Sequence, residues 1–392
     1  MRERLSWMFR KEVNQKRIGI FIVYLLIFVS FFDNHSLLPI IALYARFLGA
    51  ELALIGIIIG GYSVINLFGN LASGFLADRI GRVKPMVLGL IVVSLSVFGY
   101  SLSKNPAQLL AFRLAHGLGA AMIAPAPLAY LGDTSTPKKR GKVMAFYGAC
   151  IATTVLIGPP IAGFLKESYG YVAVFYLISL MMLLMVLPVA FLVPESLKKR
   201  GVGILKFSSI LKRKGILSSY TSAFSLMFSL GLLIVLLPLY SQDLGFSSAQ
   251  TGFLFSSFAL AAILVQIFPT NRISDLFGRK LPLIFGLFLI FLSLFSLKYF
   301  ENLPELLIVM FFYGSGFGFL FPSMTALIAD ETELGERGRA YGIFTATYSL
   351  GVVVGSVSVG FIVKIPFLHP FQVASLVALL GILSVALLLR ES

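Results

Sequence analysis

The chain has 392 residues, of which 58% are hydrophobic and only 12% carry a charged side chain. So few charges cannot cover a surface exposed to water, so the composition excludes a soluble globular protein and indicates one that lies in a lipid bilayer. The formal net charge of +15 would suggest nucleic-acid binding in a soluble protein. In a membrane protein the placement of the basic residues matters more than their sum, and no nucleic-acid partner is expected.

Apolar stretches of the length that a spanning helix needs recur from one end of the chain to the other. Backbone groups in hydrocarbon must be satisfied within the protein, and no ten-residue alternation typical of barrel strands is present, so these stretches are predicted to be helices. The expected fold class is an all-α integral membrane protein with twelve transmembrane helices. The predicted spans are residues 18–44, 53–76, 85–103, 107–132, 143–165, 171–193, 216–240, 249–270, 281–299, 304–329, 340–363 and 370–389.

The predicted spans and the segments between them divide the chain into four parts. Residues 1–17 are basic and precede an apolar run longer than a signal-peptide core, without a clear cleavage site, so they are expected to form a retained cytoplasmic N-terminus. Residues 18–193 form the predicted N-terminal six-helix bundle, and residues 216–392 the C-terminal one. Residues 194–215 are a basic linker, also predicted to be cytoplasmic.

Basic residues are strongly biased to one side of the predicted membrane. With the N-terminus inside, the cytoplasmic segments hold 26 of the 32 lysines and arginines, and Arg113 falls within a span. The opposite side has only Arg46, Lys104, Lys166, Lys298 and Lys364. This bias follows the positive-inside rule, so we expect a multi-pass protein of the plasma membrane with both termini cytoplasmic.

Comparison of the chain with itself reveals two related halves. A displacement of 197 residues maps Asp78, Gly81 and Arg82 onto Asp275, Gly278 and Arg279. Nearer the start of each half a displacement of 196 fits better, as for Gly49 and Gly245. An even number of spans separates equivalent residues, so the halves have the same orientation. A parallel repeat of this kind predicts a substrate site between the halves, near the bilayer midplane.

The loop between the second and third predicted spans carries a dense motif, Gly-Phe-Leu-Ala-Asp-Arg-Ile-Gly-Arg-Val-Lys, at residues 74–84. Its first glycine allows close helix approach, its second permits a tight turn, and its aspartate can face a helix N-terminus while pairing with an arginine. The motif and its weaker copy at residues 271–280 resemble the signature of the major facilitator superfamily, in which such a cluster latches the cytoplasmic helix ends. The resemblance implies a latch of Gly74, Asp78, Arg79, Gly81, Arg82, Asp275, Gly278 and Arg279. Charges that only fix topology would explain the basic residues, but not an aspartate that recurs in both halves.

Two further segments resemble motifs of that family, and the second of them resembles a motif of its antiporter branch. In the fourth predicted span, Arg-Leu-Ala-His-Gly-Leu-Gly from Arg113 is similar to an arginine-and-glycine motif linked to proton coupling, with His116 where many relatives carry glutamine. In the fifth span, Gly158, Pro159 and Gly163 look like the glycine-proline motif of the antiporter branch. The physical content of that motif is a bend and a close packing surface.

Away from their ends, the predicted spans contain just two formally charged residues, Asp33 and Arg113. Charged groups are costly in a bilayer, so these are functional candidates. Arg113 and His116 are three residues apart and share a helix face, and residue counts place Asp33 at a level where it can meet either. A permanently ionised Asp33–Arg113 bridge that only neutralises two buried charges is the alternative. His35 lies on a different face from Asp33 and is expected to be a packed or interfacial histidine.

The repeat sharpens this inference, because the counterparts of Asp33, Arg113 and His116 in the second half carry no charge. Those counterparts are Ser229, Met310 and Tyr313. A purely architectural ion pair would be expected in both halves, so the confinement of these groups to one half suggests chemistry. We therefore predict that Asp33, Arg113 and His116 form a proton-coupling site.

Candidates for other chemistry are few. The single cysteine, Cys150, excludes an intramolecular disulfide and a cysteine-only metal cage. No serine, cysteine or metal constellation suits catalysis, and no glycine-rich loop suits a nucleotide phosphate, so no enzyme activity, cofactor or metal site is expected.

The sequence thus predicts a secondary transporter, resembling the proton-coupled antiporters, that exports a small amphipathic or cationic molecule as a monomer. Its expected partners are that substrate, protons and the lipid bilayer. A metabolite symporter or facilitated-diffusion carrier stays open as an alternative, with a non-transport membrane enzyme further behind. Four polar residues are candidates to touch substrate, although each can equally form an interhelical hydrogen bond. They are Tyr62, Asn66, Gln266 and Tyr313.

Overall fold

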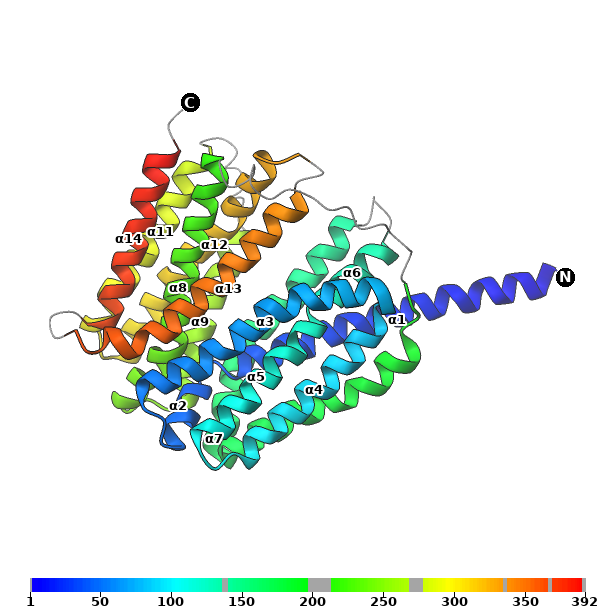
Figure 1. Cartoon of the computed structure of the whole chain (residues 1–392), viewed down its shortest axis with the longest axis horizontal. Helices are drawn as coiled ribbons and strands as arrows, with labels where there is room; N and C mark the ends of the chain where they lie inside the picture. The colour runs from blue at the N-terminus through cyan, green and yellow to red at the C-terminus, as the bar shows by residue number, and fades with distance from the viewer. Residues whose placement is uncertain are drawn as a thin grey trace.

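A computed structural model describes residues 2–135, 140–196, 213–267, 278–333, 337–365 and 369–389. Within these ranges the regular structure is helical throughout, and the helices form two bundles of like orientation (Figure 1). The first bundle contains α1 (Arg2–Ser36), α2 (Ile41–Phe47), α3 (Leu52–Ile80), α4 (Val83–Leu102), α5 (Pro106–Ile123), α6 (Pro125–Thr134) and α7 (Arg140–Leu192).

The second bundle begins after the segment that links the halves. It contains α8 (Lys214–Asp243), α9 (Ser248–Ile267), α11 (Lys280–Ser296), the short 3-10 helix η3 (Leu297–Tyr299), α12 (Leu303–Asp330), α13 (Arg337–Ile362) and α14 (Pro370–Leu388). Eleven helices of the described chain are long and apolar enough to cross a bilayer. The longest, α7, reverses at Gly170, where φ is +81° and ψ 175°, a conformation that a residue with a Cβ rarely adopts. Because α7 therefore contains two spans, the predicted total of twelve is confirmed.

Two predicted spans contain a break that the hydropathy pattern did not reveal. The span predicted at 18–44 ends as a continuous helix at Ser36, and a turn containing Pro39 leads into α2. The span predicted at 107–132 is divided at Ala124, directly before Pro125. Proline has no N–H to donate to the preceding turn, so each break has a local cause.

The internal repeat predicted from the sequence is visible as repeated backbone geometry and repeated hydrogen bonds. Gly81 and Gly278 both have positive φ, at +101° and +74°, so the same tight turn recurs in both halves. The hydroxyl of Tyr24 donates to the Val143 carbonyl at 3.1 Å. Its counterpart 196 residues later, Tyr220, donates to the carbonyl of Ala340 at 2.8 Å. The two bundles are thus two copies of one helical unit.

The two most extensive contacts between the halves are those of α3 with α13 and of α7 with α9. At both contacts a glycine lets backbones meet: a Cβ at Gly163 would overlap Ser248 and Ala249, and a Cβ at Gly360 would overlap Ala53. These contacts are equivalent under the repeat, so the junction has approximate twofold symmetry. We call this end of the molecule the closed end. From there the two halves diverge toward the end at which α6 and the last turn of α14 lie (Figure 1).

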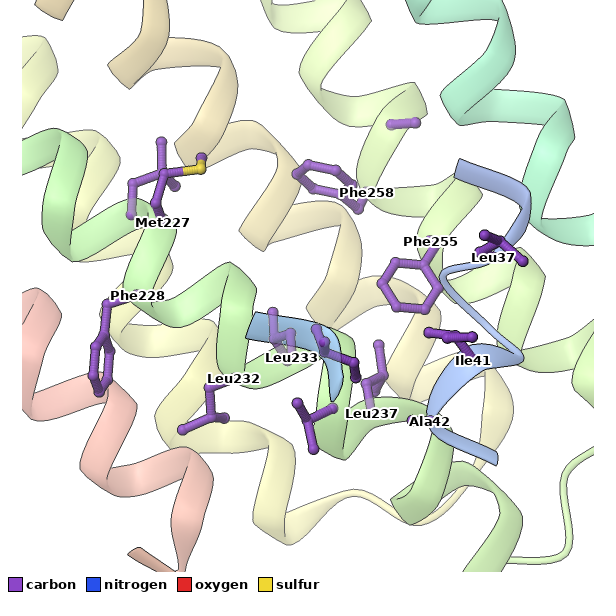
Figure 2. Packing of buried hydrophobic residues seen from close by; sticks show 14 of the residues in the cluster. Leu37, Ile41, Ala42, Met227, Phe228, Leu232, Leu233, Leu237, Phe255 and Phe258 are labelled. Carbon is purple, nitrogen blue, oxygen red and sulfur yellow. The ribbon is translucent and has the colours of Figure 1, made fainter. Parts of the chain in front are cut away.

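Apolar side chains fill the interface beside the closed end. Figure 2 shows Leu37 and Ile41, from the corner between α1 and α2, beside Leu237 of α8 and Phe255 of α9. These side chains are almost fully buried. Lipid is as apolar as leucine, so close packing rather than the hydrophobic effect holds such helices together. The fit at this corner therefore contributes directly to the closed arrangement.

Candidate functional site

A buried contact between a carboxylate and an imidazole joins α1 to α5. His116 Nε2 lies 2.8 Å from Asp33 Oδ2, and the two residues are 0% and 2% exposed. The other ring nitrogen of His116, Nδ1, lies 2.7 Å from the hydroxyl of Tyr100 on α4. A neutral imidazole donates to Asp33 and accepts from Tyr100, whereas an imidazolium donates to both. The site therefore accommodates either protonation state of His116 without moving a side chain.

The start of α5 is fixed by local signals in the sequence. Asn105 caps the helix by accepting the backbone N–H of Gln108 at 3.0 Å, and Pro106 occupies the first turn, where its missing N–H costs nothing. Arg113 and His116 then follow on one face of the helix, as their spacing predicted, since both reach Tyr100.

Arg113 does not form the ion pair with Asp33 that the sequence left open as an alternative. Its guanidinium lies 4.6 Å from the centre of the Tyr62 ring, and its Nη1 makes a long, 3.5 Å contact with the Tyr100 hydroxyl. Its Nε is buried without a partner. The carboxylate of Asp33 instead contacts His116, because α5 is rotated so that the histidine side chain points toward α1.

The second half makes the same contact without charge. Ser229 Oγ lies 2.8 Å from the hydroxyl of Tyr313, at the positions equivalent to Asp33 and His116. Tyr313 is 1% exposed and lines neither of the two cavities described below. Its hydroxyl makes the interhelical hydrogen bond, between α8 and α12, that the sequence had left open, and its contact with substrate stays a prediction.

Two adjoining cavities lie between the halves. The larger, about 670 Å³, is lined by Tyr62, Arg113 and His35 from the first half and by Gln266 from the second. Most of its second-half wall is hydrocarbon. That wall includes Leu230, Ile234, Phe255, Phe258, Ala262, Ile263 and Phe317. The cavity thus pairs a polar, charged face with an apolar, aromatic one, which suits an amphipathic ligand.

The smaller cavity, about 290 Å³, contains the carboxylate. It is lined by Asp33 together with Tyr62 and Asn66, two of the four residues predicted to touch substrate. It shares part of its lining with the larger cavity, including Tyr62 and Met227. Sequence reasoning missed Tyr348 of α13, which lines both cavities, because a single tyrosine in an apolar span carries no periodic signal.

His35 is held away from the carboxylate, as its position two residues from Asp33 predicted. Its Nδ1 lies 2.9 Å from the hydroxyl of Thr154 on α7, and its ring stacks on that of Phe31. It also lines the larger cavity, so it is a packed histidine with access to the ligand space.

The motif between α3 and α4 forms an ion pair that recurs in the second half. Arg82 Nε lies 3.3 Å from Asp133 Oδ2, and Arg279 Nε lies 3.0 Å from Asp330 Oδ2. The sequence had suggested Asp78 as the partner of an arginine. For Gly74 and Asp78 the structure describes only the helical backbone, and Asp275 lies outside the described residues. Arg79 is exposed at the end of α3.

A carboxylate that follows the last helix of the first bundle binds the loop between α3 and α4. Glu195, just after α7, accepts the backbone N–H groups of Arg82 and Val83 at 2.9 and 3.2 Å. Both N–H groups belong to the start of α4, where the helix dipole favours a negative charge. The positive φ of Gly81 makes room for it, because a Cβ there would overlap the Glu195 carboxylate.

The glycine-proline motif of the fifth predicted span lies at the junction of the halves. Gly163 contacts the start of α9, and the carbonyl of Pro159 lies where a Cβ on Gly252 would stand. Gly158 faces Ser36 at the end of α1. The close packing surface expected from the motif is therefore the contact between α7 and α9.

Two charged contacts cross the closed end, and neither was foreseen from the sequence. Arg46 Nη1 lies 2.8 Å from Asp243 Oδ1, with both side chains substantially exposed. Glu167 Oε1 accepts the backbone N–H of Ala249 at 3.1 Å, in the first turn of α9. Each contact joins the first half to the second, so the closed end is held by charge as well as by glycine packing.

Two like-oriented helical units, joined at one end and enclosing cavities beside a buried carboxylate–imidazole pair, are the architecture of a secondary membrane transporter. The sequence profile of the Major Facilitator Superfamily matches residues 23–222 and again residues 219–392. The chain therefore belongs to the Major Facilitator Superfamily, as its motifs had indicated.

Individual relatives cover nearly the whole chain. "Multidrug resistance protein 2" of Bacillus subtilis is 26% identical over 388 residues, which is 95% of this chain and 96% of the relative. "Quinolone resistance protein NorA" of Staphylococcus aureus is 23% identical over 372 residues, 93% of this chain and 95% of the relative. A solved bacterial homologue of the human lysosomal transporter Spinster superposes with a TM-score of 0.75 at 14% identity, covering 95% of this chain and 94% of its own. The last likeness shows a shared fold.

Proposed function

We propose that the chain is a proton-coupled antiporter that exports a small amphipathic or cationic molecule by alternating access. The observation that carries the proposal is the 2.8 Å contact between Asp33 and His116, two titratable groups buried beside cavities that both halves line. Ionisable groups inside a membrane are costly and mark ion and substrate pathways. The second half builds the same contact from hydroxyl groups, so the charge is not needed to join the helices.

Asp33, Arg113 and His116 are the proposed coupling residues. Asp33 Oδ2 is held by His116, whereas Oδ1 has no partner and the residue lines the smaller cavity. A proton and a cationic substrate compete for the same carboxylate, so occupancy by one disfavours the other, which is the requirement for antiport. The fixed positive charge of Arg113 sets how tightly the carboxylate holds either.

The orientation of the molecule follows from the distribution of its basic residues. The closed end carries Arg46 and Asp243, in a segment that the positive-inside rule places outside the cell. On this orientation the cavities face the cytoplasm, ready to receive cargo, and both termini are cytoplasmic. Each proton that moves into the cell releases about 2.3 kcal/mol of free energy per 100 mV of membrane potential, and this free energy can drive export.

The proposed latch of the alternate, outward-open state lies at the cytoplasmic end. It comprises Gly74, Asp78, Arg79, Gly81 and Arg82 with Asp275, Gly278 and Arg279. The repeated pairs Arg82–Asp133 and Arg279–Asp330 support this assignment, because they place equivalent charges at equivalent helix ends in both halves.

The substrate class rests on the walls of the larger cavity and on the relatives. Tyr62, Asn66 and Gln266 are proposed to offer polar contacts, opposite a wall of apolar and aromatic side chains. The relatives named for multidrug and quinolone resistance support the export of organic molecules by this chain. We propose a monomer in the plasma membrane, with residues 18–193 and 216–392 as its two moving units and residues 194–215 as their linker.

Symport of an anionic metabolite is the rival that one observation favours. Arg113 lines the larger cavity and has no carboxylate within ion-pairing distance among the described residues, so an anion could bind there together with a proton on Asp33. Such a carrier would accumulate its substrate along with protons instead of exporting it.

Flux in proteoliposomes under an imposed pH gradient tests the proposal. A fluorescent amphipathic amine should move against the proton flow, and Asp33→Asn should abolish the effect of the gradient. Ser229→Ala, at the equivalent position of the second half, is the matched control and should pump normally. Equal flux after the gradient is collapsed would remove proton coupling, and uphill movement together with protons would establish symport.

A further inference from the structure

Three polar atoms of the smaller cavity are buried without a hydrogen-bond partner. They are Ser30 Oγ, Asp33 Oδ1 and the hydroxyl oxygen of Tyr348. Most buried polar side chains in folded proteins have partners, and leaving one unpaired is costly. Three such atoms around one cavity of about 290 Å³ indicate a space built for a ligand that supplies donors.

The three atoms come from both halves of the molecule. Ser30 and Asp33 are three residues apart on α1 and share a face, whereas Tyr348 is on α13. A ligand that met all three would therefore contact both moving units at once. Within the described chain, Asp33 is the only Asp, Glu, Lys, Arg or His residue that lines this cavity.

We infer that this cavity binds the primary ammonium group of the substrate, with Ser30, Asp33 and Tyr348 as its acceptors. A primary ammonium has three N–H donors and one positive charge, matching three acceptors of which one is a carboxylate. A quaternary ammonium has the charge but no N–H, so it would leave all three atoms unsatisfied. The inference rests on the proposed function and narrows its substrate class to amphipathic primary amines.

The surrounding charges are compatible with this assignment. His116 engages Asp33 Oδ2, which leaves Oδ1 for the ligand. Arg113 lines the larger cavity and not the smaller one, and its guanidinium lies 4.6 Å from the centre of the Tyr62 ring. An anionic head group in the smaller cavity would meet the carboxylate of Asp33 instead.

The larger cavity can hold the apolar part of such a molecule. The two cavities share the side chains of Phe31, Tyr62, Tyr147 and Met227, so they are continuous along an aromatic and apolar surface. A ligand with its ammonium at Asp33 can therefore extend toward Phe255 and Phe258 of the second half.

Binding of two matched probes to the purified protein tests the inference. The probes are dansyl-hexylamine and its N,N,N-trimethyl derivative, which share a body and a charge and differ in N–H donors. The primary amine should bind at least about tenfold more tightly. Tyr348→Phe and Ser30→Ala should each weaken its binding by about three- to tenfold and leave the trimethyl probe unaffected. Tyr176→Phe, a lipid-facing tyrosine outside both cavities, is the control for loss of a hydroxyl.

The outcomes separate this inference from the proposed function. Equal affinity for the two probes, or equal weakening of both by Tyr348→Phe in a variant that melts normally, would overturn the ammonium site. If both probes were nevertheless pumped by a pH gradient, proton-coupled export would stand. Selective binding of the primary amine without any effect of the gradient on flux would keep the ammonium site and remove the coupling.

Discussion

The hydroxyls of Ser229 and Tyr313 lie 2.8 Å apart at the positions where the first half has Asp33 and His116, also in contact at 2.8 Å. One contact in two chemical versions thus joins the first and fourth spans of each bundle. Because the neutral version suffices to join α8 to α12, the charged version is more than a means of holding helices together.

Replacing the charged pair by its neutral counterpart should separate folding from coupling. The double variant Asp33→Ser/His116→Tyr reproduces the contact of the second half, so we expect its melting temperature in detergent to stay within a few degrees of the parent. Its flux should no longer respond to a pH gradient. His116→Ala alone leaves a buried carboxylate unpaired and should cost about 3–5 kcal/mol. A double variant that still pumps would show that the pair is dispensable.

The glycine contact between the halves should control which state is populated. Gly163→Ala places a methyl group against Ser248, so we expect the closed end to open and sites near Ile234 to be labelled from outside. Gly148→Ala is the matched control on the same helix, because nothing lies near a Cβ there. A cysteine at residue 234, in a Cys150→Ala background, reports the change. Equal labelling of both variants would refute the role of the contact.

The ion pair between Arg46 and Asp243 should stabilise the closed end only modestly. Arg46 and Asp243 are both well exposed, so removing either side chain should shift the balance between states by no more than about 1 kcal/mol. Arg46→Asp should favour opening by like-charge repulsion, and adding Asp243→Arg should reverse it. The same cysteine labelling measures both steps, and high salt should weaken both effects. A swap that fails to restore closure would argue against the pair.

His369 should make the stability of the second bundle depend on pH. Burial, and next the charge of Lys298, lower the pKa of His369 below its ordinary value of 6.5. Its neutral Nδ1 accepts the N–H of Phe371 and caps α14. The folded state thus binds this proton less readily than the unfolded state, so the contribution is complete above pH 6.5 and is lost as the pH falls through the lowered pKa.

The variant His369→Asn tests that assignment. Asparagine can also cap a helix but does not titrate in this range. Thermal unfolding at pH 7 and pH 5 should therefore differ less in the variant than in the parent. An unchanged difference would mean that other groups set the acid sensitivity.

Most of the fold was predictable because membrane helices are long and the repeat is regular. Span positions follow from hydropathy. The repeat at 196 to 197 residues predicts equivalent turns at Gly81 and Gly278, and both glycines have a positive φ. The breaks at Pro39 and Pro125 were missed, because both prolines lie within stretches that are apolar on either side. Hydropathy measures solubility in lipid and does not sense a missing N–H.

The site was predictable in its members but not in all its contacts. The spacing of Arg113 and His116 and the depth of Asp33 placed these three residues near one another, but the sequence could not show whether Arg113 or His116 meets the carboxylate. That choice depends on the rotation of α5 about its axis, which packing against other helices decides. Tyr348 and the pair Arg46–Asp243 depend on how the halves meet, which no pattern within one helix records.

The two walls of the larger cavity are chemically unlike. Its basic side chains, Arg113 and His35, come from the first half, whereas residues such as Leu230, Phe255 and Phe258 of the second half supply mainly shape and apolar contact. Substitutions on α8 and α9 can therefore alter which cargo fits while the machinery that harnesses the gradient is left intact. Substrate preference can therefore change in evolution through substitutions in the second half, while the residues of the first half that couple transport to the proton gradient stay the same.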